Sequence, residues 1–123
     1  MPSSFKDLRV WREAIKFTVA VYRVTGRFPK HELYGLTQQL RRAVVSVPSN
    51  IAEGRGRGAP RDYRRFLYLA RGSLYELDTQ IELAAQLGYC REDDVSRIQI
   101  AIAGAMRPLQ GLISSLNRKI GDN

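Results

Sequence analysis

The chain has 123 residues, of which 44% are hydrophobic and 26% charged, and this balance fits one globular domain over residues 1–123 rather than a disordered chain. Its single cysteine, Cys90, excludes an internal disulfide and a thiolate metal cluster, and no apolar run approaches the roughly 18 residues of a membrane span. The formal net charge is +8, and sixteen of the twenty basic residues are arginine, whose planar set of donors suits phosphate.

The first expected element is a helix over residues 7–25. The residues before it lack the apolar core of a secretion signal, so we expect a cytoplasmic protein. Gly26 follows the helix, where a residue without a Cβ suits a left-handed cap. Apolar residues three and four positions apart predict the side that faces the core, namely Leu8, Trp11, Ile15, Val19 and Tyr22.

This helix has a second apolar face. Its members also recur at spacings of four and three, and they are Val10, Ala14, Phe17, Val21 and Val24. A helix that is apolar on two faces is usually buried on both. Because a four-helix monomer covers one such face well, we expect the second face to meet another subunit. The alternative is that the helix lies deep within its own bundle.

The second expected helix covers residues 33–53. Its apolar side consists of Leu33, Leu36, Leu40, Ala43, Val44, Val47 and Ile51. Pro48 lacks the N–H of a helical hydrogen bond and should kink this helix. We expect Asn50 and Gln39 to bond the carbonyl that Pro48 frees or a neighbouring helix. Glycines 54, 56 and 58 should end the helix.

Between the second and third helices lies the segment Arg55-Gly56-Arg57-Gly58. As a loop it would place mobile backbone amides beside the guanidinium groups of Arg55 and Arg57, an arrangement suited to an anion. It is not the phosphate loop of a nucleotide hydrolase, because no strand precedes it and no lysine followed by serine or threonine ends it. A flexible connection without a ligand is an equal alternative.

The third expected helix begins at Pro60, a residue that fits a first helical turn, and it ends at Gly88. Its core side consists of Tyr63, Phe66, Ala70, Leu74, Leu77, Ile81 and Ala84. The fourth helix opens with Glu92, Asp93 and Asp94, whose charges favour a helix start. Its core side consists of Ile98, Ile102, Ala105, Leu109, Leu112, Leu116 and Ile120. Pro108 should kink this helix.

A basic and aromatic stripe runs along the third helix, on a side away from its core residues. At spacings of three and four, its members are Arg61, Arg64, Tyr68, Arg71 and Tyr75. Arginines at this spacing can follow a phosphate backbone, and tyrosine rings can stack on unpaired bases. The stripe should stop at Asp78 and Glu82. Alternatively, the two tyrosines contact a neighbouring subunit and the arginines form the rim of that interface.

Four long helices with short connections predict an all-α, up-down-up-down four-helix bundle. No catalytic or metal-binding motif accompanies it, and we expect neither a cofactor nor an enzymatic activity. The only histidine, His31, lies in an expected turn, and the paired Glu-x-x-His motifs of a di-iron bundle are absent. We interpret Glu76, Asp78 and Glu82 as a solvated helix face.

Several segments resemble a family of bacterial four-helix-bundle proteins that are encoded in intervening sequences of large-subunit ribosomal RNA genes. They are residues 5–11 (FKDLRVW), 34–43 (YGLTQQLRRA), 46–54 (SVPSNIAEG), 66–77 (FLYLARGSLYEL) and 87–89 (LGY). The family is similar to the accessory proteins of diversity-generating retroelements, which form pentameric rings with basic surfaces. The resemblance therefore implies a homo-oligomer, for which a pentameric ring is one form, and a reverse transcriptase as one candidate partner. It implies no catalytic residues.

Together these observations predict a cytoplasmic, non-enzymatic, basic homo-oligomer that binds RNA or DNA with little sequence preference. The alternative is a protein-interaction scaffold whose charge serves an acidic protein partner.

Overall fold

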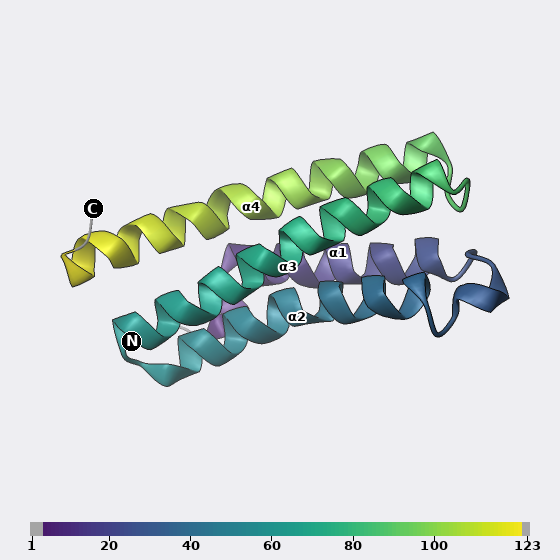
Figure 1. The fold of residues 1–123 in the computed structure, drawn as a ribbon. Coiled ribbons are helices and arrows are strands. Elements are labelled where there is room, and N and C mark those ends of the chain that lie inside the picture. The colour runs from purple at the N-terminus through teal and green to yellow at the C-terminus, as the bar shows by residue number, and fades with distance from the viewer. Residues whose placement is uncertain (1–3, 122–123) are drawn as a thin grey trace.

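The structure is a computed structural model that describes residues 4–121. Within this range there are two short 3₁₀ helices and four long α-helices and no strand: η1 (Phe5–Asp7), α1 (Arg9–Thr25), η2 (Lys30–Glu32), α2 (Leu36–Arg57), α3 (Pro60–Gln86) and α4 (Glu92–Ile120). Successive long helices run antiparallel, so both ends of the described chain and the α2–α3 turn lie at one end of the bundle (Figure 1). This confirms the predicted all-α four-helix bundle.

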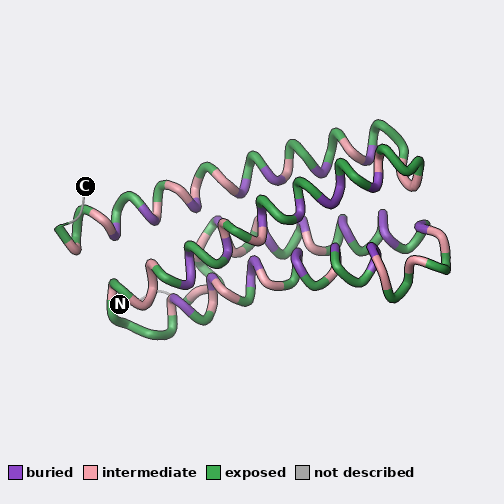
Figure 2. Tube along the Cα trace, in the orientation of Figure 1, coloured by how far each residue is buried: buried purple, intermediate pink, exposed green. Residues whose placement is uncertain are grey.

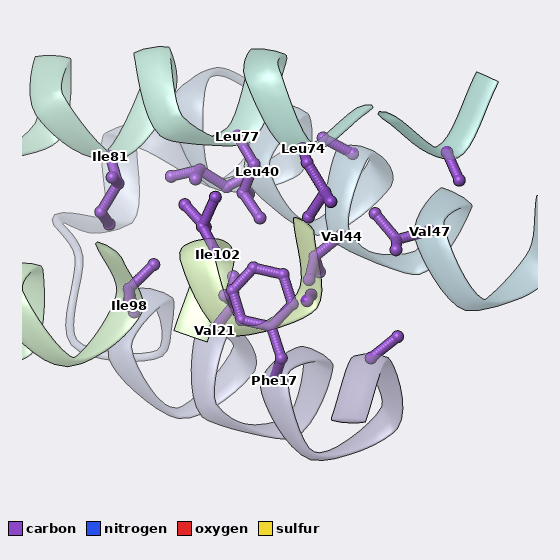
Figure 3. Packing of buried hydrophobic residues seen from close by; sticks show 14 of the residues in the cluster. Phe17, Val21, Leu40, Val44, Val47, Leu74, Leu77, Ile81, Ile98 and Ile102 are labelled. Atoms are coloured by element: carbon purple, nitrogen blue, oxygen red, sulfur yellow. The ribbon is translucent and has the colours of Figure 1, made fainter. Parts of the chain in front are cut away.

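Each helix packs against two others. The neighbouring pairs are α1 with α2, α2 with α3, α3 with α4, and α1 with α4, whereas α1 and α3, like α2 and α4, lie diagonally opposite each other. The four helices therefore occupy the corners of a square, and their buried sides face its centre (Figure 2). Figure 3 shows Phe17 of α1, Val44 of α2, Leu77 of α3 and Ile102 of α4 in this common core.

The two apolar faces of α1 take roles opposite to those predicted. The residues predicted to meet another subunit (Val10, Ala14, Phe17, Val21 and Val24) are all buried in the core of the chain itself. That interface prediction is therefore wrong. The predicted core side is the outer one, because Ile15, Val19 and Tyr22 are 38%, 44% and 41% exposed, and Trp11 is half-buried. On this outer side the Trp11 indole and the Tyr22 hydroxyl stay near solvent, where their polar atoms need no buried partner.

The start and end of α1 also differ from the prediction. The helix begins at Arg9, after η1, in which Ser4 and Asp7 form a reciprocal capping box. Gly26 has a φ of −62°, so no left-handed cap forms. Instead the backbone N–H groups of Arg27 and Phe28 donate to Val24 and Thr25, which tightens the chain into a turn after the helix.

Pro48 lies inside α2, which continues through it. The carbonyl that Pro48 leaves without its helical donor is that of Val44. The Thr18 hydroxyl of α1 approaches this oxygen at 3.4 Å while also bonding Ala14 of its own helix at 2.7 Å. Asn50 instead donates to the carbonyl of Ser46, so the prediction that it bonds the freed carbonyl is wrong. Pro108 likewise lies within the uninterrupted helix α4.

The α2–α3 junction depends on two glycines in different ways. The helix continues through Gly54 and Gly56 to Arg57, so only Gly58, with a φ of +81°, ends it. Gly54 is buried because α3 packs directly against it: a Cβ there would lie 2.7 Å from Phe66 Cβ and 3.0 Å from Tyr63 Cδ1. Pro60 occupies the start of α3 as predicted.

In the other three helices, most of the residues predicted to face the core are buried, with a few exceptions. Leu33 lies before α2 and is exposed, while Tyr63, Leu112 and Ile120 are half-buried. Ile113 is buried in α4 in addition to the predicted residues. These shifts lie at helix ends or at the edges of a helical stripe, where the period alone separates inside from outside poorly.

A hydrogen bond joins the two connections at the far end of the bundle. The Tyr89 hydroxyl donates to Glu32 Oε2 at 2.8 Å, and the Leu36 backbone N–H donates to Glu32 Oε1 at 3.0 Å. The Leu36 N–H and then the Tyr89 hydroxyl lower the pKa of Glu32 from its ordinary value of 4.5. Because a lowered carboxyl pKa stabilises the folded state only while the group is ionised, this contribution is present above pH 4.5 and is lost as the pH falls through the lowered value.

We therefore expect Tyr89→Phe to lower the melting temperature modestly at neutral pH. The difference from the wild type should shrink as the pH falls below 4.5, since Glu32 then loses its charge in both proteins. Thermal melts followed by circular dichroism across a pH series measure this. A difference that stays constant down to strongly acidic pH would contradict the role of the Glu32 carboxylate.

Candidate nucleic-acid interface

Two arginines of the predicted stripe lie along the seam between α3 and α4. Arg64 Nη1 donates to Asn117 Oδ1 at 2.9 Å, and Arg71 Nη1 donates to Gln110 Oε1 at 3.0 Å. Arg64 and Arg71 are seven residues apart, and so are their partners Asn117 and Gln110, because two packed antiparallel helices rise by the same distance per residue. Both guanidinium groups are thereby held in fixed positions while their side chains stay partly exposed.

Tyrosine rings lie beside these arginines on the outer side of α3. The Arg71 guanidinium carbon is 4.8 Å from the centre of the Tyr68 ring, a cation–π contact. Tyr68 is 38% exposed and Tyr75 is 56% exposed, so both rings are accessible for stacking. Arg61 is exposed one turn before Arg64. The structure thus brings the five predicted stripe residues together on one exposed surface.

Helix α4 adds basic residues to this surface that the sequence reasoning missed. Arg107 is exposed one turn from Gln110, and Arg118 is exposed next to Asn117. The signal was present in the sequence: between Val95 and Ile120 the helix has no acidic residue. We call the combined set the α3–α4 surface; it comprises Arg61, Arg64, Tyr68, Arg71, Tyr75, Arg107, Gln110, Asn117 and Arg118.

Acidic residues border the α3–α4 surface at one end. On α3 the stripe meets Asp78 and Glu82, and both are exposed. The antiparallel course of α4 places its acidic first turn at the same end, so Glu92 and Asp93 lie there as well. The surface is consequently basic over the half of the bundle that contains the chain ends (Figure 1) and acidic at the opposite end.

The two loop arginines are placed differently from the prediction. Arg55 and Arg57 belong to the last turns of α2, so the segment is not a mobile loop with free amides, and the predicted anion-binding loop is wrong. Arg57 Nη2 bonds Glu53 Oε1 at 3.1 Å, and its guanidinium lies over the Phe66 ring at 5.1 Å. Arg57 therefore belongs to the α2–α3 packing rather than to the α3–α4 surface.

The outer side of α1 and α2 contains an open groove of about 620 Å³. Its apolar part is formed by Tyr22, Leu33, Tyr34 and Val45, all of which are exposed. Arg41 is held beside it, with its guanidinium 4.6 Å from the centre of the Tyr22 ring. This groove is continuous with the exposed face of α1 through Tyr22.

Groups that could perform acid–base or metal chemistry are dispersed. No cluster of three or more His, Cys, Asp or Glu side chains suited to a metal ion occurs between residues 4 and 121. His31 Nε2 lies 3.5 Å from the Tyr89 hydroxyl at the end of the bundle. Glu76 pairs with Arg42 of α2 at 3.3 Å and thus joins two helices.

Between residues 4 and 121, no helix has the length and apolar character that crossing a membrane requires.

The fold and this surface define an all-α four-helix-bundle protein with a basic helical face. Residues 6–111 match the family described as 23S rRNA-intervening sequence protein, and the chain belongs to that family. A similar solved structure is that of a protein with unknown function from the S23 ribosomal protein family of Bacteroides thetaiotaomicron. The two are 19% identical with a TM-score of 0.76, over 85% of this chain and 97% of that one, a likeness that shows the fold. No curated protein matches the chain.

Proposed function

We propose that this chain is a cytoplasmic, non-enzymatic module that binds the phosphate backbone of RNA or DNA through the α3–α4 surface, with little sequence preference. The observation that carries this proposal is the alignment of Arg64 and Arg71 with α4, in a region where five exposed or partly exposed arginines occur together. Arginine contacts to phosphate provide affinity and position but do not read base edges. Tyr68 and Tyr75 add rings on which unpaired bases can stack.

The experiment is a salt titration of binding to a labelled single strand and a labelled duplex, followed by fluorescence anisotropy. Phosphate contacts release counterions, so the logarithm of the association constant should fall linearly with the logarithm of salt concentration, with a slope of about −0.9 per phosphate contact in a duplex and about −0.7 in a single strand. A scaffold for an acidic protein would show no salt-dependent binding to either. Absence of binding to both at low salt would exclude nucleic acid as the ligand.

We also propose that the chain associates with copies of itself, through the α1–α2 groove rather than through the buried face of α1 that contains Phe17. Exposed apolar side chains that adjoin one another favour burial against a partner. Tyr22 and Val45 line the groove, and the exposed Ile15 and Val19 lie on the same side of α1 as Tyr22 because they recur at helical spacing. A ring form and a reverse transcriptase partner stay predictions that rest on the resemblance.

Val45→Glu should convert the assembly to a folded monomer, because a carboxylate would then be buried in the interface without a partner. Light scattering coupled to size-exclusion chromatography measures the mass of both proteins. Leu69→Glu is the matched control, since Leu69 is also exposed but lies on α3 outside the groove. A wild-type chain that is monomeric at micromolar concentration would refute self-association.

A further inference from the structure

Three arginines line one cavity at the end of the bundle opposite the chain ends. The cavity, of about 230 Å³, lies between α1 and α4, which run antiparallel, so the end of α1 meets the start of α4 there (Figure 1). Its charged lining residues, which we call the arginine cluster, are Arg23, Arg27, Asp94 and Arg97. The cluster is separate from the α3–α4 surface, because Arg64 and Arg71 bond residues near the other end of α4.

A buried carboxylate brings two of these arginines together. Oδ2 of Asp94 accepts a hydrogen bond from Arg27 Nη2 at 2.8 Å. Oδ1 of the same carboxylate lies 3.9 Å from Nη1 of Arg97, which follows Asp94 by three residues in α4. Arg27 reaches the carboxylate from the turn after α1, where its backbone N–H donates to Val24. Two guanidinium groups from different parts of the chain therefore lie close together before any ligand binds.

The arginines of the cluster keep donors that face solvent. The side chains of Arg27 and Arg97 are 60% and 78% exposed, although the carboxylate between them is buried. A guanidinium has several N–H donors in one plane, so a bond to Asp94 leaves others for a ligand. Arg23 is also exposed and adds a third guanidinium to the same cavity. Planar donors that converge on one cavity are suited to the oxygens of a phosphate.

The charge of the cluster favours a phosphate at the end of a molecule. Three positive charges and one negative charge leave two positive charges. A phosphate monoester carries a charge of about −1.5 to −2 at pH 7, whereas a phosphate within a nucleic-acid backbone carries a single negative charge. The nearby Glu92 lines a different cavity, together with Glu82 of α3. The remaining lining of the arginine cavity is apolar and consists of Ala20, Val24, Ile98 and Ala101.

We propose that the arginine cluster binds a terminal phosphate group, that is, a phosphate monoester at the end of a nucleic-acid strand or on a small molecule. Arg23, Arg27 and Arg97 donate to its oxygens, and the apolar lining contacts the group that carries the phosphate. This site is independent of backbone binding by the α3–α4 surface, so either of the two can fail without the other.

The test is a titration of the isotope-labelled chain with inorganic phosphate and with a nucleoside monophosphate, followed by the backbone amide signals in NMR spectra. Signals of residues 20–27 and 94–101 should shift at lower ligand concentration than those of residues 61–75 in the α3–α4 surface. The double change Arg23→Gln with Arg97→Gln should weaken this binding by about tenfold or more, because charge-assisted hydrogen bonds are the stronger ones. The bond between Arg27 and Asp94 stays in this variant, and thermal melts verify its fold.

Lys16→Gln with Lys30→Gln is the matched control, because it removes the same charge from two exposed residues that do not line the cavity. If the arginine variant binds inorganic phosphate and the nucleoside monophosphate as tightly as this control does, the proposed site is wrong. It is also wrong if neither ligand shifts the signals around the cavity.

Short single strands that end in a phosphate or in a hydroxyl distinguish the two sources of the ligand. If the terminal phosphate increases affinity and the arginine variant loses that increase, the ligand is a strand end. If the nucleoside monophosphate binds at the cavity but the terminal phosphate adds nothing to strand binding, the ligand is a small phosphate ester. A failure of the proposed backbone binding would leave the signal shifts around the cavity in place, whereas a failure of this site would leave the salt titration unchanged.

Discussion

Gly54→Ala is expected to lower the free energy of unfolding by about 1–3 kcal/mol, the usual range for an overpacked core. The added Cβ would lie 2.7 Å from Phe66 Cβ, an atom fixed to the α3 backbone, so α2 and α3 would have to move apart. It would also approach the Tyr63 carbonyl oxygen at 3.2 Å. Denaturant unfolding followed by circular dichroism measures the change.

Gly72→Ala is the matched control for this prediction. Gly72 lies inside α3, is exposed, and has open space where its Cβ would be. There the substitution removes only the conformational freedom of glycine, and it should raise stability by about 0.5–1 kcal/mol. If both variants are stabilised alike, the close approach of α3 to Gly54 is not required for the fold.

Charge reversal on α3 is expected to abolish nucleic-acid binding. Arg64→Glu with Arg71→Glu replaces two aligned cations by two anions in the middle of the α3–α4 surface. The bundle should stay folded, because both positions are partly exposed and outside the core, and a glutamate can still accept from the amides of Gln110 and Asn117. Affinity should fall for every sequence tested, since these residues contact backbone rather than bases.

The tyrosine between these arginines should act differently. Tyr68→Ala removes a ring that only an unpaired base can stack on, a contact of about 1–3 kcal/mol per base, so a single strand should lose more affinity than a duplex. The same anisotropy titration measures both ligands. Equal losses for both would indicate that Tyr68 supports the position of Arg71, whose guanidinium lies over its ring.

For the charge reversal, Arg64→Glu with Arg71→Glu, unchanged binding would place the nucleic-acid site elsewhere on the molecule.

Local properties of the sequence predicted the helices and much of the core. The period of apolar residues places Leu40, Leu74 and Ile98 inward, and the structure buries all three. Pro60 begins α3 because its fixed φ and missing N–H suit a first helical turn. The arginine–tyrosine stripe on α3 was predicted in the same way, because residues on one side of a single helix are determined by spacing alone.

Relations between helices needed the tertiary structure. Both faces of α1 are apolar at helical spacing, so the period cannot decide which one is buried; packing places Phe17 in the core and leaves Val19 outside. Gly54 was expected to end α2, but its missing side chain serves the close contact with α3 instead. A residue's own sequence neighbours contain no information on such a contact.

The candidate interface, too, was predicted only in part from the sequence, and the rest of its residues depend on how the helices pack. Sequence reasoning located Arg64 and Arg71 on one helix, and it also included Arg55 and Arg57, which the structure places in the last turns of α2. Only the antiparallel packing of α4 shows that Gln110 and Asn117 hold the two arginines. Spacing along the chain determines which residues share a side of one helix, whereas the neighbour of that side depends on how the helices pack in space.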